Sequence, residues 1–68
     1  MEFSERLRML RKEKKETQVQ TAKAVEITDR QYQRFEAGEC LPGFTNLWGL
    51  ADHFEVSMDY LAGRTDER

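Results

Sequence analysis

Apolar residues recur at helical spacing in the first part of the chain. Phe3, Leu7 and Leu10 follow an i, i+4, i+7 pattern, with charged residues between them. This spacing places the three side chains on one face of a helix. The pattern predicts an amphipathic helix over residues 3–14, with a last turn rich in Lys and Arg, where cations suit the helix dipole.

Two short helices are predicted next, and each begins after a threonine. Thr17 and Thr28 are both followed three residues later by a glutamine, which is a capping-box pattern. The pattern predicts helices over 18–25 and 29–37, and Gly38 stands where a C-cap glycine belongs. Because so short a segment separates the two helices, they must cross steeply, in a helix-turn-helix shape.

The second half of the chain predicts two further helices after a loop over 39–43. Apolar residues at helical spacing mark a fourth helix over 44–54: Phe44, Leu47, Leu50, Ala51 and Phe54. Ser57 can cap a fifth helix over 58–62, and residues 65–68 are expected to fray. The fold class is therefore all-α, with five helices and no strand.

Length and cysteine usage narrow the class of protein. A chain of 68 residues supports a single domain over 1–68, with a thin core. Its one cysteine, Cys40, and one histidine, His53, are too few for an internal disulfide or a metal site. We expect no cofactor, no signal peptide, no membrane span and a reducing, cytoplasmic environment.

Charge is distributed unevenly along the chain. Residues 1–34 hold nine Lys and Arg against six Asp and Glu, whereas residues 35–68 hold two against seven, which gives the overall charge of −2. Such polarity favours one face that meets an anion and another that repels it. Ordinary solvated surface charge explains the pattern equally well.

Several segments together resemble a known family. In order they are FSERLRMLRKEK, TQ with an alanine four residues after the glutamine, ITDRQYQRFEAG and NLWGLADHFEVSMDYLAGR. From Phe3 to Arg64 the chain resembles the phage repressor and Cro (Xre) type of helix-turn-helix transcriptional regulator. The resemblance implies a compact five-helix lambda-repressor-like domain. Its second helix would cross the DNA backbone and its third would enter the major groove.

By this resemblance the third helix reads bases with four side chains: Asp29, Arg30, Gln33 and Arg34. Arg30 and Arg34 suit the O6 and N7 acceptors of guanine. Gln33 suits adenine or a phosphate. Asp29 either accepts from a cytosine amino group or only stabilises the positive start of its own helix.

The resemblance also implies phosphate contacts. Gln18 matches a family position that binds phosphate at a helix start. Thr17 and Thr28 either add contacts or only cap their helices. Three lysines either contact phosphates or stay solvated: Lys12, Lys14 and Lys15. Arg11 and Glu36 match a pair that in relatives forms a partly buried salt bridge between the first and third helices.

The chain departs from the family pattern in four places. Lys15 and Glu26 stand where relatives often have glycine, so a positive φ at Glu26 would store strain. Thr21 replaces a usual aliphatic residue, so the core should lose apolar area there. The loop over 39–41 carries no basic residue, which implies fewer phosphate contacts and weaker binding.

Trp48 and Met58 are candidates for a homodimer contact. Trp48 lies between inward-facing positions of the fourth helix and leans toward solvent, or else folds onto the edge of the core. Relatives dimerise through this region and read palindromic operators. Cys40 is interpreted as an incidental loop thiol, and His53 as a residue of the surface or core edge.

The resemblance implies a sequence-specific, double-stranded DNA-binding transcriptional regulator. It is expected to be a prokaryotic or phage repressor that acts as a homodimer without a small-molecule effector. No nucleophile and base, phosphate loop or metal cluster can be assembled from the sequence, so catalysis is not expected. The alternative is a protein-interaction or antitoxin-like module on the same scaffold, with weak DNA binding.

Overall fold

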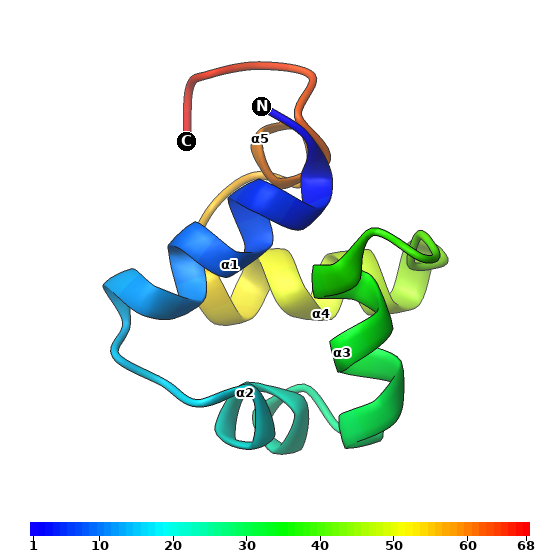
Figure 1. The fold of residues 1–68 in the computed structure, drawn as a ribbon. Helices are drawn as coiled ribbons and strands as arrows, with labels where there is room; N and C mark the ends of the chain where they lie inside the picture. The colour runs from blue at the N-terminus through cyan, green and yellow to red at the C-terminus, as the bar shows by residue number, and fades with distance from the viewer.

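The computed structural model describes all 68 residues and contains five helices and no strand. In chain order they are α1 (Phe3–Glu13), α2 (Gln18–Ala24), α3 (Asp29–Ala37), α4 (Phe44–Phe54) and α5 (Met58–Ala62) (Figure 1). Every predicted helix is present, and the first two end one residue earlier than expected. No helix combines the length and the apolar character that crossing a membrane requires.

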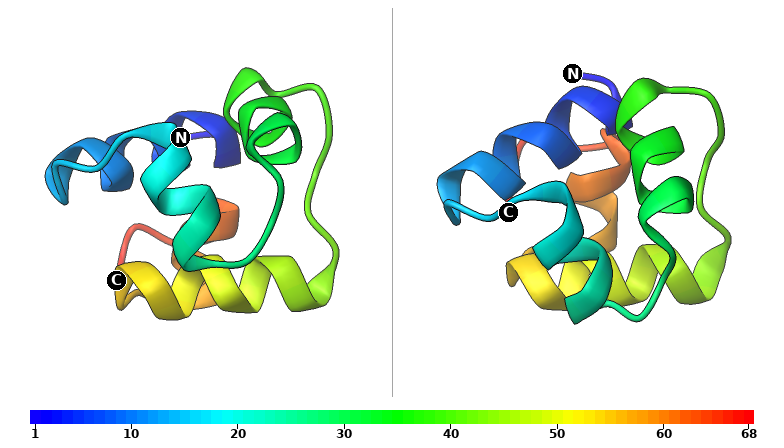
Figure 2. Two further views of the ribbon diagram at one scale, coloured as in Figure 1. Left: turned by 90° about the horizontal axis from the view of Figure 1, so that it is seen from below. Right: turned by 60° about the horizontal axis from the view of Figure 1, so that its bottom comes forward.

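A single cluster of eleven buried apolar residues lies between the helices. All five helices contribute to it, and the side chains with no exposed surface include Leu7, Ala22, Tyr32, Phe35, Leu50 and Leu61. Helix α3 packs against both α1 and α2, while α5 packs against α1 and α4. Figure 2 shows α2 and α3 as neighbouring helices, with α4 passing across the molecule beside them.

Phe44 does not join this core, contrary to the inward position that its helical spacing predicts. It is the first residue of α4 and is 65% exposed. The four other apolar positions of α4 are buried or half-buried, so the helix does present the predicted face. Phe44 instead packs edge-to-face on Trp48, with ring centroids 5.7 Å apart.

The predicted caps set the helix boundaries. The hydroxyls of Thr17, Thr28 and Ser57 each accept a hydrogen bond from the backbone N–H three residues later. Each bond satisfies one of the free N–H groups at the start of a helix. Gly38 ends α3 with φ of 76°, a left-handed conformation that glycine adopts without a Cβ clash.

Three residues other than glycine also have a positive φ: Lys15 at 59°, Glu26 at 61° and Glu55 at 57°. Lys15 and Glu26 are the two positions where relatives often have glycine, so the predicted strain at Glu26 is present. Glu55 was not predicted. Each such residue costs roughly 1–2 kcal/mol relative to a right-handed conformation.

Residues 65–68, for which the sequence predicts fraying, fold back onto the body of the protein. Arg6 is only 4% exposed and donates hydrogen bonds to the backbone oxygen of Thr65, at 2.7 Å, and to that of Tyr60. Arg68 forms an ion pair with Glu13 at 2.7 Å. Arg6 is therefore part of the interior rather than one of the solvated cations of α1.

Candidate nucleic-acid interface

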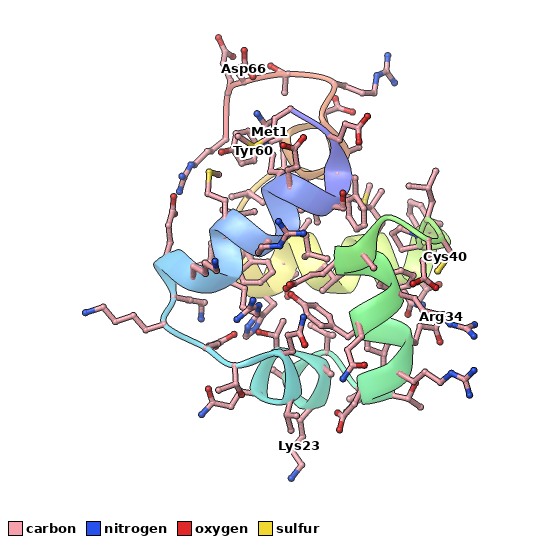
Figure 3. The ribbon with its side chains drawn as sticks, viewed as in Figure 1. Met1, Lys23, Arg34, Cys40, Tyr60 and Asp66 are labelled. Atoms are coloured by element: carbon pink, nitrogen blue, oxygen red, sulfur yellow. The ribbon has the colours of Figure 1, made fainter.

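Helix α3 has a buried side and an exposed side. Tyr32, Phe35 and Glu36 are buried against the rest of the protein. With 3.6 residues per turn, Arg30 and Arg34 lie on the opposite side of the helix. Figure 3 shows Arg34 projecting away from the body of the molecule. All four predicted base-reading side chains are exposed: Asp29, Arg30, Gln33 and Arg34.

Two arginines on the exposed side of α3 lie beside a shallow hollow. Arg30 and Arg34 line a shallow hollow with Thr28, Gln31 and Cys40, and no carboxylate takes part in its lining. Cys40 lies near Arg34 in Figure 3. The structure contains no ion pair to either arginine, so both guanidinium groups keep their donors free.

The buried carboxylate of Glu36 ties three elements together. Arg11 of α1 approaches it with two nitrogens, Nε at 2.6 Å and Nη2 at 3.2 Å. Gln18 of α2 donates its amide at 3.1 Å, and the hydroxyl of Tyr32 also donates. The Arg11–Glu36 pair implied by the resemblance is thus present, with two further donors that the sequence did not reveal.

Glu36 stays charged although it is buried. Burial raises the pKa of its carboxyl, but hydrogen bonds from Arg11, Tyr32 and Gln18 lower it more, so the pKa lies below its ordinary value. Burial, together with the bond to this carboxylate, raises the pKa of Tyr32. The network therefore holds a fixed negative charge that orients α3 relative to α1 and α2.

The predicted phosphate-contact residues of the two caps retain free hydrogen-bonding groups. Gln18 uses one amide N–H on Glu36, and an amide has two such donors. Thr17 and Thr28 use a hydroxyl lone pair for capping, which leaves each O–H proton for another acceptor. Capping and phosphate contact are therefore compatible roles for both threonines.

The three predicted lysines differ in their surroundings. Lys12 and Lys15 are exposed and have no ion-pair partner. Lys14 lies 3.8 Å from a carboxylate oxygen of Glu16. Two of the three ammonium groups are therefore free near the junction of α1 and α2.

A second polar cluster was missed by the sequence reasoning. Thr21 is fully buried, and its hydroxyl donates to Oε1 of Glu16 at 2.7 Å. Nε2 of His53, on α4, lies 2.8 Å from the same oxygen. Thr21 thus buries less apolar area than an aliphatic residue would, but its hydroxyl makes a hydrogen bond inside the protein. His53 lies at the edge of the core. No spacing in the sequence signals this contact, because 37 residues separate His53 from Glu16.

The two dimer candidates are unequally exposed. Trp48 is 58% exposed and packs edge-to-face on Phe44, with ring centroids 5.7 Å apart. Leu41, in the loop before α4, is also exposed. Met58 is half-buried and packs against the core. Three of the five exposed large apolar side chains therefore lie at the start of α4 and in the loop before it, and the other two are Met1 and Val19.

Comparisons with known proteins agree with this architecture. A model of the helix-turn-helix family matches residues 7–61. The chain is 44% identical over 69 residues to the cryptic phage CTXphi transcriptional repressor RstR of Vibrio cholerae, covering 98% of this chain and 62% of that protein. It is 38% identical over 65 residues to YobD of Bacillus subtilis, an uncharacterised HTH-type transcriptional regulator, covering 96% of this chain and 58% of YobD. The chain thus spans about three-fifths of the length of the curated relatives it matches.

Solved structures show the same fold. The P22 c2 repressor, crystallised in complex with the synthetic operator 9T, matches with a TM-score of 0.86 and 31% identity, over 90% of this chain and 92% of that one. A transcriptional regulator from Listeria innocua matches with a TM-score of 0.86 and 31% identity, over 98% of this chain and 63% of that one. The named relatives are repressors and regulators, and none is named as an enzyme.

Proposed function

Because the chain belongs to the helix-turn-helix family, we propose that it is a transcriptional regulator that binds double-stranded DNA sequence-specifically and acts as a repressor. In this proposal α3 enters the major groove and α2 lies across the backbone. The operator complex of the similar P22 c2 repressor supports the assignment.

The observation that carries the proposal is the free state of Arg30 and Arg34. Both lie on the exposed side of α3, and neither has an ion-pair partner in the chain. A guanidinium fork of this kind matches the O6 and N7 acceptors of guanine, at about 1–3 kcal/mol of discrimination for each bidentate contact. Gln33 would read an adjacent adenine or reach a phosphate, and Asp29 would accept from cytosine or stabilise the start of α3.

Backbone contacts would come from the junctions on either side of α2. Their proposed residues are Thr17, Gln18, Thr28, Lys12, Lys14 and Lys15. Neutral donors position the protein on the duplex, and the lysines add sequence-independent attraction. Lys14 should contribute least, because Glu16 already lies 3.8 Å from its ammonium group.

We further propose that two copies bind a palindromic operator. The exposed Trp48 and its neighbour Phe44 offer the apolar surface for the dimer contact, and the half-buried Met58 is the other candidate residue. Half-sites about one helical turn apart would then match the two-fold symmetry of the protein.

The test is selection from a pool of random duplexes followed by sequencing, with the original chain, Arg34→Ala and Arg64→Ala side by side. Arg64 is the matched control, because it is exposed and its side chain forms no ion pair, but it follows α5 rather than lying on α3. We expect an enriched palindrome with the original chain and with Arg64→Ala. Arg34→Ala should relax the preference for guanine at one position of each half-site.

The outcome also decides between DNA and a protein partner. The exposed apolar side chains of Leu41, Phe44 and Trp48 would suit a protein-interaction module on the same scaffold. Absence of enrichment at low salt, with all three chains behaving alike, would reject the DNA proposal in favour of that module.

A further inference from the structure

The segment that joins α1 to α2 is held by a second polar cluster in addition to the Glu36 network. Oε1 of Glu16 accepts a hydrogen bond from Thr21 on α2 and lies 2.8 Å from Nε2 of His53 on α4. Both Glu16 and His53 are only partly exposed, so water screens the contact incompletely. One carboxylate oxygen thus connects the joining segment with two helices.

Charged groups surround His53 from three directions. Glu16 approaches from the joining segment, with Lys14 at 3.8 Å on its other oxygen. Glu26, in the turn between α2 and α3, and Asp52, on α4 itself, line a hollow beside the imidazole. The charged form of His53 makes an ion pair with Glu16, whereas the neutral form makes only a hydrogen bond.

The Glu16 carboxylate responds to this contact. Burial raises the pKa of Glu16, but hydrogen bonds from His53 and Thr21 lower it more, so the pKa lies below its ordinary value. Glu16 is therefore ionised throughout the range in which imidazole groups change charge, about pH 5 to 8. His53 is the only histidine of the chain.

Glu16 directly precedes the proposed phosphate-contact residues Thr17 and Gln18. Its backbone oxygen accepts a hydrogen bond from Arg11 at 2.9 Å, and Gln18 is held by Glu36. The segment is thus fixed to α1 and α3 by contacts whose charges do not change near neutral pH. Its contact with α4 is the one whose strength depends on a histidine.

We infer that the Glu16–His53 ion pair positions the segment that carries Thr17 and Gln18 on DNA, and that it makes DNA affinity decrease as pH rises and the imidazole loses its proton. This inference rests on the proposed DNA-binding function. It makes Glu16 and His53 positioning residues that contact no DNA themselves.

The experiment measures binding to a fluorescein-labelled duplex of mixed sequence by anisotropy. The duplex has about 24 base pairs, and salt is kept at about 50 mM, because phosphate contacts are independent of sequence and strongest at low salt. Between about pH 6 and pH 8 the original chain should lose roughly fivefold or more in affinity, the size of a typical coupling between sites.

Two variants distinguish positioning from simple charge. His53→Gln keeps a side-chain N–H for Glu16 but does not titrate, so its affinity should be constant over the same range. Glu16→Gln keeps His53 and an acceptor for Thr21, yet it should also lose the pH dependence. If the charge of His53 acted on DNA directly, Glu16→Gln would keep the pH dependence of affinity that the original chain shows.

Asp52→Asn is the matched control, because Asp52 lines the same hollow but has no ion pair with His53. It should keep the slope of the original chain, and thermal unfolding of each variant at both pH values checks that it is folded. A pH-independent affinity in the original chain, or an unchanged slope in Glu16→Gln, would overturn the inference while leaving DNA binding intact. No binding of the original chain to the duplex at any pH would overturn both the inference and the proposed function.

Discussion

The arginines of α1 and those of α3 stand in opposite situations. Arg6, Arg8 and Arg11 each donate to an oxygen of the chain, whether a backbone carbonyl or the carboxylate of Glu36. Arg30 and Arg34 have no ion-pair partner and lie in solvent. Arginine therefore joins α1 to other elements of the protein, whereas on α3 it remains free to bind a second molecule.

Burial explains why the two groups should respond differently to substitution. Arg6 and Glu36 are almost completely buried. Removing a hydrogen-bond partner of either side chain leaves a buried polar group that neither water nor protein can bind. Arg30 and Arg34 lose only solvated surface contacts when they are truncated.

Glu36→Ala should be the most destabilising change, at roughly 3–5 kcal/mol, because it leaves the Arg11 guanidinium and the Tyr32 hydroxyl without their acceptor. Urea unfolding followed by circular dichroism measures the loss. Should this variant not fold, Glu36→Gln should fold with a smaller loss. Glu39→Ala removes an exposed carboxylate without an ion pair and should stay within about 0.5 kcal/mol. Equal effects at the two glutamates would contradict the comparison.

Acid should weaken the same junction. The pKa of Glu36 in the folded chain lies below its value in the unfolded chain, near 4.3. Its stabilising contribution is therefore complete above the unfolded value and is lost as pH falls through the lower, folded value. Unfolding measured from about pH 6 down to about pH 3 should show this loss in the original chain and a flatter profile in Glu36→Gln. Parallel profiles would assign the acid sensitivity to other carboxylates.

Arg34→Ala should separate binding from stability. Its free energy of unfolding should change by no more than about 0.5 kcal/mol, because the side chain is exposed and has no ion-pair partner. Its affinity for a selected operator should fall by about 1–3 kcal/mol, the value of one guanine contact. Arg11→Ala provides the reverse case, with a large loss of stability. A stability loss of similar size in Arg34→Ala would remove the distinction between the two helices.

Glu26→Gly should stabilise the chain by up to about 1 kcal/mol, since φ of 61° strains a residue with a Cβ. The gain is limited by the extra backbone entropy of glycine in the unfolded chain. Thermal unfolding measures it, and Glu26→Ala, which keeps the Cβ, is the control. A greater stability in Glu26→Ala than in Glu26→Gly would show that the turn is not strained by its side chain.

The smallest effects are expected at the lysines. Lys15→Gln should reduce the slope of log affinity against log salt by about 0.9, if its free ammonium group contacts one phosphate. Lys14→Gln should change the slope less, because its ammonium group lies 3.8 Å from Glu16. Anisotropy titrations at several salt concentrations compare the two variants. Equal slopes in both would mean that the ion pair does not withhold Lys14 from DNA.

Local signals in the sequence specify the five helices and place their ends to within one residue. Apolar periodicity, threonine and serine caps, and glycine at a C-cap act over four residues or fewer, so these signals are complete within each segment. Resemblance then identified the Arg11–Glu36 pair and the exposed residues of α3. Both lie where expected, although the contacts of α3 with DNA remain a prediction.

Apart from the Arg11–Glu36 pair, the polar contacts between distant parts of the chain follow from tertiary packing. The contact of Gln18 with Glu36, the burial of Arg6 and the contact of His53 with Glu16 all depend on the crossing of helices. The exposure of Phe44 likewise depends on which parts of α4 the other elements cover. A helix is specified by contacts between near neighbours in the chain. A buried ion pair needs two side chains to come within about 3 Å, and packing alone determines whether distant residues do so.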